Sequence, residues 1–558
     1  MRLAPPLASG FLLAAALLSP RAVQAQDGTW ALTNARIETV TRGTIEKGTI
    51  VIRDGLIEAV GANVNPPGDA RVVDLAGRTV YPGLIDLTSS MGLPAPSVGG
   101  GGFGGGGGGG GGQGSAQGAN RPRFVGLEPG RLIATEVNPP AGDLRAARDL
   151  GITAALIAPT RGAFRGLSAL LPMHEDSAAQ KVVRSPVGLH MGFQGVGGRY
   201  PQTLLGVIAY ERQQFYDAQH HAAMLDRYRA GGRGVSRPSY DPDLDALVPV
   251  VRGQLPAFFA ANNENEIRRA LDLAKEFNLK LTVVGATEGF RAIDALKASG
   301  RPVVVSVEFP NASNVTGWQY RGAQRRELND SATREAAVKR LVEGNAATLH
   351  QAGVRFALAS GSLKPTDFLA NVRKTIAAGL PRQAALEALT IRAAEIAGAE
   401  NQLGSIETGK IANLVITQGD LLSENPQIRM VFVDGVGHEV IPAAAARGTR
   451  AAGGGGPTAQ AGGTWAMLVS SPQGEVPTTL TLTQSGDALD GSMTSQFGSA
   501  SISNGRVQGR TVTFSLSMTV GGQTMEMTVE GEVEGNRMTG RIRTGEMGTM
   551  NFTAERRP

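Results

Sequence analysis

The chain has 558 residues, of which 41% are hydrophobic and 18% are charged, and its formal net charge is +5. This length exceeds one ordinary core, so we expect two or three domains of a globular rather than a disordered protein. Lys and Arg are scattered, with no basic run interleaved with aromatic residues, which argues against nucleic-acid binding. The absence of cysteine excludes thiolate ligands and thiol nucleophiles.

The first 25 residues have the pattern of a secretory signal peptide. Arg2 gives a positive start, Leu7–Leu18 is an apolar run, and Val23–Ala25 ends the segment in a small-x-small pattern. The pattern predicts cleavage after Ala25 and an exported protein, periplasmic or secreted. No later stretch approaches about 18 uninterrupted apolar residues, so we expect no transmembrane segment in the mature chain.

Residues 29–80 alternate in the manner of short strands joined by turns, with Gly55 and Gly77 at hairpin or bulge positions. The stretch Val80–Pro94 follows, and its apolar residues carry a single carboxylate, Asp86, after the pair Pro82-Gly83. This pattern predicts a short buried strand entered from a turn.

Gly99–Gly114 is almost pure glycine, which predicts a loop over residues 99–118, either an inserted linker without a role or a loop at a site. From residue 142 to residue 402, strand-like and helix-like runs alternate. Repeated β-then-α order over roughly 300 residues predicts a parallel (β/α) barrel.

Residues 441–462 read as an Ala/Gly/Pro/Thr linker. After it, continuous alternation of apolar and polar residues with Gly-containing turns predicts a separate antiparallel sandwich or up-and-down barrel over residues 463–558. Its opening, Gly463–Trp465, is faintly similar to that of lipocalin-type barrels.

Three stretches resemble the amidohydrolase superfamily, in its secreted imidazolonepropionase-like branch. They are Pro82–Asp86 (PGLID), Val51–Gly61 (VIRDGLIEAVG) and Leu403–Val436, which contains GSIETGKIANLV. The resemblance implies an α/β fold: a TIM (β/α)8-like barrel over residues 84–402. It also implies a composite small β-sandwich built from residues 26–83 and 403–440.

In that family, divalent metal is held at the strand ends by His-x-His on strand 1, a Lys on strand 4, His on strands 5 and 6, and Asp on strand 8. In this sequence the positions that match these ligands by local sequence similarity are Thr88, Ser90, His190, Ala260, Asn262, Gly285 and Gly361. Hydroxyls and apolar groups are poor ligands for a zinc-like ion. We therefore predict that these residues line a pocket without a metal or other cofactor.

Other polar residues near strand ends offer little for catalysis. Glu288 and Glu308 are candidates for metal-free acid–base work if they lie close together, although a barrel rim always carries some carboxylates. Ser360-Gly361-Ser362 has no evident base beside it in the sequence.

Three hypotheses follow. The first is a catalytically degenerate, metal-free barrel that binds a small-molecule or peptide ligand. The second is an active hydrolase of carbon–nitrogen bonds, for example in amides or dipeptides, with a non-standard site and zinc or another divalent metal. The third is a protein that binds its ligand through the C-terminal β domain. The sequence does not determine the oligomeric state.

Overall fold

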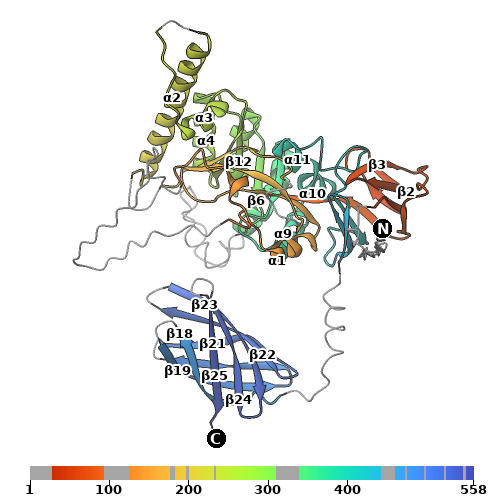
Figure 1. Cartoon of the computed structure of the whole chain (residues 1–558), viewed down its shortest axis with the longest axis vertical. Coiled ribbons are helices and arrows are strands. Elements are labelled where there is room, and N and C mark those ends of the chain that lie inside the picture. Colours follow the sequence, from red (N-terminus) through yellow and green to blue (C-terminus); the bar gives the residue numbers. More distant parts are fainter. Residues whose placement is uncertain are drawn as a thin grey trace, which may run out of the picture. The chain divides into compact units, whose positions relative to one another are not determined.

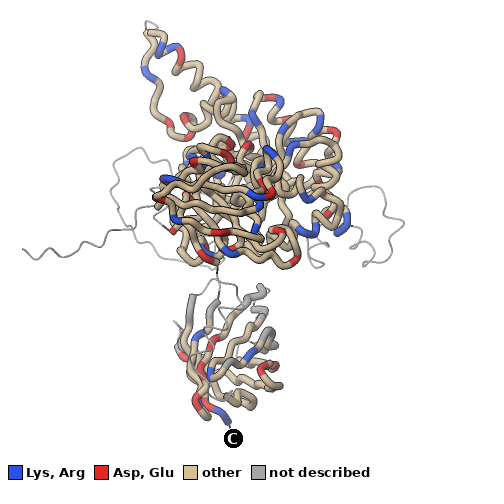
Figure 2. The backbone as a smooth tube through the Cα atoms, turned by 90° about the vertical axis from the view of Figure 1, so that its right-hand side faces the viewer, with Lys and Arg blue, Asp and Glu red and all other residues tan. Residues whose placement is uncertain are grey.

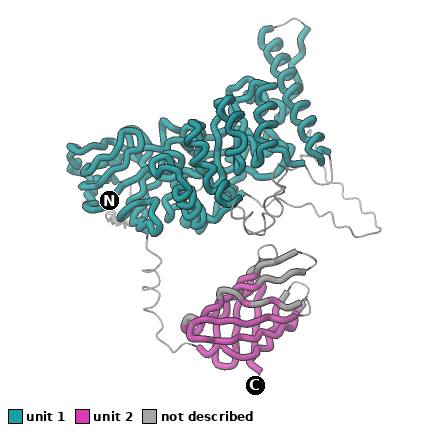
Figure 3. The backbone as a smooth tube through the Cα atoms, turned by 180° about the vertical axis from the view of Figure 1, so that it is seen from behind, with its two compact units in different colours: residues 1–440 teal, residues 441–558 magenta. Residues whose placement is uncertain are grey.

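The computed structural model describes residues 28–93, 126–175, 182–195, 200–231, 234–309, 338–440, 459–471, 474–495, 498–520, 523–544 and 548–557. The chain divides into two compact units, residues 1–440 and 441–558 (Figure 3). The predicted signal peptide and the glycine-rich loop 99–118 lie outside the described residues, as does most of the predicted linker.

Both flanks of the first unit contribute to one mixed sheet. Its strands are β1 (Trp30–Glu38), β2 (Thr44–Arg53), β3 (Leu56–Gly61), β4 (Arg71–Asp74), β5 (Thr79–Pro82), β15 (Leu414–Gln418), β16 (Gln427–Val433) and β17 (Val436–Glu439). The order is β17-β16-β15-β5-β1-β2-β3, with β4 paired to β1. The antiparallel β5–β15 pair, which runs from Pro82 opposite Leu414 to Thr79 opposite Thr417, joins the two flanks. That this sheet forms a sandwich stays a prediction.

The middle of the first unit is TIM-barrel-like, as predicted. Its parallel pairs involve β6 (Leu84–Ser89), β7 (Ile152–Ile157), β10 (Leu189–Gly192), β11 (Ala257–Ala261), β12 (Leu281–Gly285), β13 (Val303–Ser306) and β14 (Phe356–Ala359). Strand β6 pairs with β7, and β10 to β14 pair in chain order.

The barrel wall departs from uniform parallel pairing between β7 and β10. Two four-residue strands, β8 (Phe164–Leu167) and β9 (Ala169–Pro172), run antiparallel to β10 and β7 respectively. The buried Ser168 lies between them, and its backbone N–H donates to Gly188 O over 3.0 Å. The described strands of the barrel wall therefore form two mixed sheets, one in the order β14-β13-β12-β11-β10-β8 and one in the order β6-β7-β9.

Helices surround these strands (Figure 1). They are α1 (Ala141–Arg148), α2 (Leu204–Arg229), α3 (Pro242–Val251), α4 (Glu264–Glu276), α5 (Ile293–Ser299), α8 (Asn345–Gln351), α9 (Pro365–Ala377), α10 (Arg382–Leu389) and α11 (Ile391–Ala397), with 3-10 turns η1 (Ile133–Thr135) and η3 (Gly289–Arg291). Because strand side chains alternate between faces, two apolar clusters form. One joins strand residues such as Ile85, Leu156 and Phe258 to α11, and the other packs the opposite strand faces against helices.

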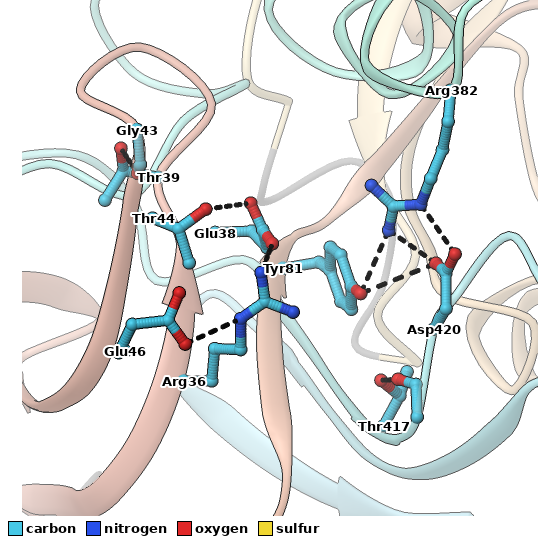
Figure 4. A network of polar contacts seen from close by, with 11 residues as sticks. Arg36, Glu38, Thr39, Gly43, Thr44, Glu46, Tyr81, Arg382, Thr417 and Asp420 are labelled. Atoms are coloured by element: carbon cyan, nitrogen blue, oxygen red, sulfur yellow. Dashed lines mark hydrogen bonds and ion pairs between the residues drawn. The ribbon is translucent and has the colours of Figure 1, made fainter.

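A polar network couples α10 to the mixed sheet (Figure 4). The Arg382 guanidinium donates to both carboxylate oxygens of Asp420, 2.6 Å from Nε to Oδ2, and its Nη2 donates to the Tyr81 hydroxyl over 3.1 Å. Burial alone raises the pKa of Asp420, but the hydrogen bonds from Arg382, the Leu422 N–H and Tyr81, together with the Arg382 charge, outweigh it and hold that pKa below its usual value. The network fixes α10 against β5 and the turn after β15.

The second unit is a closed antiparallel barrel. Its strands are β18 (Gly463–Ser471), β19 (Gly474–Ser485), β20 (Ala488–Ser495), β21 (Gly498–Gln508), β22 (Thr511–Val520), β23 (Gln523–Glu534), β24 (Arg537–Thr544) and β25 (Gly548–Arg556). Each strand pairs with the next, and β25 closes on β18. The predicted separate all-β domain is confirmed, and of the two expected architectures it is the barrel.

Side chains from all around this barrel meet in one apolar cluster that includes Trp465, Phe514 and Phe552. Residues before β18 pack against this cluster, since Trp465 Nε1 donates to Ala461 O over 3.0 Å. On β25, the Arg556 guanidinium lies 4.6 Å from the Trp465 ring centre. Binding of a ligand by this unit stays a prediction.

Charged residues of both signs are interspersed along the chain (Figure 2). Within the described ranges, no helix is long and apolar enough to cross a membrane.

Candidate functional site

A cavity of about 250 Å³ lies where β6 and β14 end, bounded by α1 and the start of α9. Active sites of TIM barrels form at the carboxyl ends of the strands. Three of the predicted pocket residues, Thr88, Ser90 and Gly361, line this cavity, together with Asp86, Asp143 and Ser362. His190, Ala260, Asn262 and Gly285 do not line it.

Asp86 holds the ends of β6 and β14 together. Its side chain is buried and accepts hydrogen bonds from Ser360 N (3.0 Å), Ser360 Oγ (2.6 Å) and Thr88 N (3.3 Å). A buried carboxylate needs such donors to offset its lost hydration. Burial nevertheless raises the pKa of Asp86, and the hydrogen bonds from Ser360 and Thr88 only partly oppose this rise.

Thr88 and Gly361, at the matched strand-1 and strand-8 positions, bind each other. The Gly361 N–H donates to Thr88 Oγ1 over 2.7 Å. Gly361 has a φ of +70°, and a Cβ there would lie 2.5 Å from Ser306 Oγ and 2.9 Å from Glu308 Oε2. The site therefore has no room for a carboxylate at position 361 unless its neighbours move. We call Asp86, Thr88, Ser360 and Gly361 the seam cluster.

Glu288 and Glu308 serve different elements. Glu308 accepts from Ser362 Oγ over 2.6 Å and from Ser362 N over 3.2 Å. Glu288 Oε2 instead accepts from the backbone N–H of Glu264, at the start of α4, over 3.1 Å. Glu308 therefore holds the loop after β14 through Ser362, and Glu288 caps the start of α4.

Asn262 and Gly285 are neighbours at the ends of β11 and β12. A Cβ on Gly285 would overlap the Asn262 carboxamide, and Gly285 has a φ of +96°. The carboxamide thus occupies the space that a longer side chain at position 285 would need.

His190 is buried within the barrel wall. Its ring stacks on Phe258, the residue opposite it on β11, with centroids 4.8 Å apart and planes at 7°. Its Nε2 has no hydrogen-bond partner in the described part of the chain. Burial, and then the charge of Arg165, lower the pKa of His190 to about 3.

Arg165 and Glu211 were not singled out by sequence reasoning. A Cβ on Gly192, at the end of β10, would lie 2.6 Å from Arg165 Nη2, so the guanidinium lies against this strand end near Ala260. Glu211, on α2, is fully buried, and burial raises its pKa well above the usual value although the Arg165 charge opposes this. No local sequence motif marks Arg165 and Glu211, because they lie far apart in the sequence. Only the antiparallel β8–β10 pairing and the position of α2 bring them together.

We expect His190 to stay uncharged across the neutral range. Its folded pKa lies below the unfolded value of about 6.5, so the unfolded chain binds the extra proton, and stability falls as the pH drops below that value. In NMR spectra of protein labelled at histidine, the His190 ring signals should not titrate between about pH 5 and 8. A titration midpoint for His190 within that pH range would contradict the burial argument.

The seven matched positions do not fit the family's metal centre. They offer two hydroxyls, one imidazole, one carboxamide and three residues without a donor side chain. The Thr88 hydroxyl is occupied by the Gly361 N–H, and the Arg165 cation opposes a second cation near His190. Over the residues that the structure describes, no three His, Asp or Glu side chains are grouped so as to hold a metal ion. We therefore derive no step through a metal.

A family model and one solved structure agree with this fold. Residues 323–437 match the model of the amidohydrolase family. The crystal structure of an amidohydrolase from Thermotoga maritima MSB8 aligns with a TM-score of 0.58 at 24% identity, over 73% of this chain and 98% of that one. A prolidase complexed with N-methylphosphonate-L-proline aligns with a TM-score of 0.43 at 16% identity, over 74% and 99%. No curated protein matches the sequence.

The first unit is thus TIM-barrel-like, and the seam cluster joins the ends of its strands β6 and β14. Its resemblance to the amidohydrolase superfamily, predicted from sequence wording, is confirmed.

Proposed function

We propose that the first unit is an exported amidohydrolase-like barrel that binds a small molecule or peptide without metal-dependent hydrolysis. The observation that carries this proposal is the direct hydrogen bond from Gly361 N to Thr88 Oγ1. It joins the strand-1 and strand-8 positions from which relatives would present metal ligands. Ser306 and Glu308 also fill the space that a side chain at position 361 would need.

The electrostatics near β10 and β11 support the same proposal. A metal site lowers the pKa of bound water through concentrated positive charge held by anionic or neutral ligands. Here a fixed guanidinium, Arg165, lies beside the strand ends, and its Nε donates to Gly162 O over 3.1 Å. This cation favours an anionic group of a bound ligand over a metal ion.

A second candidate is an active hydrolase of carbon–nitrogen bonds. It is favoured by the family match and by Ser362, which lines the cavity and whose hydroxyl donates to Glu308 over 2.6 Å. A carboxylate that accepts the proton of a serine is one route to a nucleophile. Both side chains are exposed to solvent, which disfavours strong activation.

A hydrolysis assay separates the two candidates. We expect no turnover of amides or dipeptides above background, with or without added zinc or manganese. Turnover that metal stimulates would contradict the proposal. Turnover without metal that Ser362→Ala and Glu308→Gln abolish, but the exposed-serine control Ser236→Ala preserves, would establish the second candidate.

A further inference from the structure

A second cavity, lined by several basic residues, lies at the opposite end of the barrel from the seam cluster. It has a volume of about 440 Å³, within the range of small-molecule sites. Its walls are the residues that begin β10 to β14, together with the C-terminal end of α11. Sites in TIM barrels form at the other face, so this cavity is separate from the proposed function.

Cations dominate the lining. Five basic residues face one carboxylate, Glu395; the basic residues are Arg184, Lys280, Arg301, Arg355 and Arg392. Arg392 pairs with Glu395 over 3.0 Å, and the Arg184 guanidinium donates to Gly398 O. The remaining three cations form no ion pair with any residue that the structure describes.

Strand pairing brings these three cations together. Lys280 precedes β12, Arg301 lies two residues before β13, and Arg355 precedes β14. The three strands are consecutive neighbours in the sheet, about 4.8 Å apart. The backbone ladder continues to this edge, since Val283 N donates to Pro302 O and Val303 N donates to Arg355 O. Like charges on adjacent strands repel one another, and an anion between them would relieve that repulsion.

We propose that this cavity, defined as the basal pocket, binds a small organic anion that carries at least two phosphoryl groups. Guanidinium groups match the paired oxygens of phosphate, and an ammonium adds a compact charge. Three unpaired cations exceed what a single phosphate needs. The concave shape and limited volume fit a small molecule rather than a nucleic-acid strand.

Calorimetric titration of the full chain with inorganic pyrophosphate, in the presence of chelator, tests the basal pocket. We expect saturable one-site binding that is at least about tenfold weaker for orthophosphate, because fewer charge-assisted hydrogen bonds form. The double variant Arg301→Gln/Arg355→Gln should lose about tenfold or more in pyrophosphate affinity. The charge-matched control, Arg227→Gln/Arg237→Gln, alters exposed residues outside the pocket and should change affinity less than about twofold.

Three results would overturn the proposal. One is the absence of binding up to about 10 mM pyrophosphate. Another is an equal loss of affinity in both double variants, which indicates diffuse attraction to a basic protein. If the first double variant does not fold, the single variant Lys280→Gln, at an exposed residue, takes its place. The third overturning result is an unchanged pyrophosphate affinity in that single variant. Amide hydrolysis and metal content play no part in this test, so its outcome is independent of the proposed function.

Discussion

Replacing Asp86 with alanine is expected to lower the free energy of unfolding of the first unit by about 3–5 kcal/mol. The carboxylate is buried and accepts from the backbone N–H and the hydroxyl of Ser360. Its removal leaves both donors buried without a partner, and each such group costs about 1–3 kcal/mol. The shift in the urea midpoint of this unit, followed by circular dichroism, measures the loss.

Asp143→Ala is the matched control for Asp86→Ala. Asp143 lines the same cavity but is exposed in the first turn of α1, so its loss should cost at most about 1 kcal/mol. In a double-mutant cycle, Asp86→Ala and Ser360→Ala should be non-additive, because both remove the hydrogen bond from Ser360 Oγ to Asp86. Equal, small effects of Asp86→Ala and Asp143→Ala would contradict the structural role of the seam cluster.

Trp465→Ala is expected to destabilise the second unit by about 3–5 kcal/mol and to leave the first unit unchanged. Trp465 is fully buried in the barrel cluster, and its indole nitrogen donates to Ala461 O. The substitution removes a large apolar surface and the hydrogen bond that ties residue 461 to the barrel. Differential scanning calorimetry of the full chain should show one lowered transition.

Leu468→Ala, on the same strand, is the control for Trp465→Ala. The Leu468 side chain is 43% exposed, so its truncation should cost less than about 1 kcal/mol. A single transition that both variants move equally would show that the two units unfold together, against their division into separate compact units.

Sequence periodicity predicted the strands well where each strand is continuous. Ile152–Ile157 and Ala257–Ala261 are short apolar runs between turns, and both are buried strands. The strict alternation after residue 463 predicted antiparallel pairing, which the closed barrel confirms. The antiparallel strands β8 and β9 escaped prediction, because Arg165 and Gly166 interrupt the apolar run of β8 and one residue, Ser168, separates the two strands.

The candidate site was less predictable, since its contacts join distant segments. Local sequence similarity to the family drew attention to Thr88 and Gly361, but not to the hydrogen bond between them, which spans 273 residues. Asp86 was noticed as the one carboxylate of its strand, whereas its partner Ser360 follows a different strand. Arg165 carries no motif, so only strand pairing could reveal it at the end of β10.

Metal content of the purified full chain tests the central claim most directly. The protein is dialysed without chelator and analysed for zinc, manganese and iron. We expect less than about 0.1 equivalent of any of these metals. We also expect no rise in the unfolding temperature when metal is added, because a metal that does not bind the folded state cannot stabilise it. One or two equivalents, lost together with a drop in that temperature on chelation, would contradict the metal-free seam between Thr88 and Gly361.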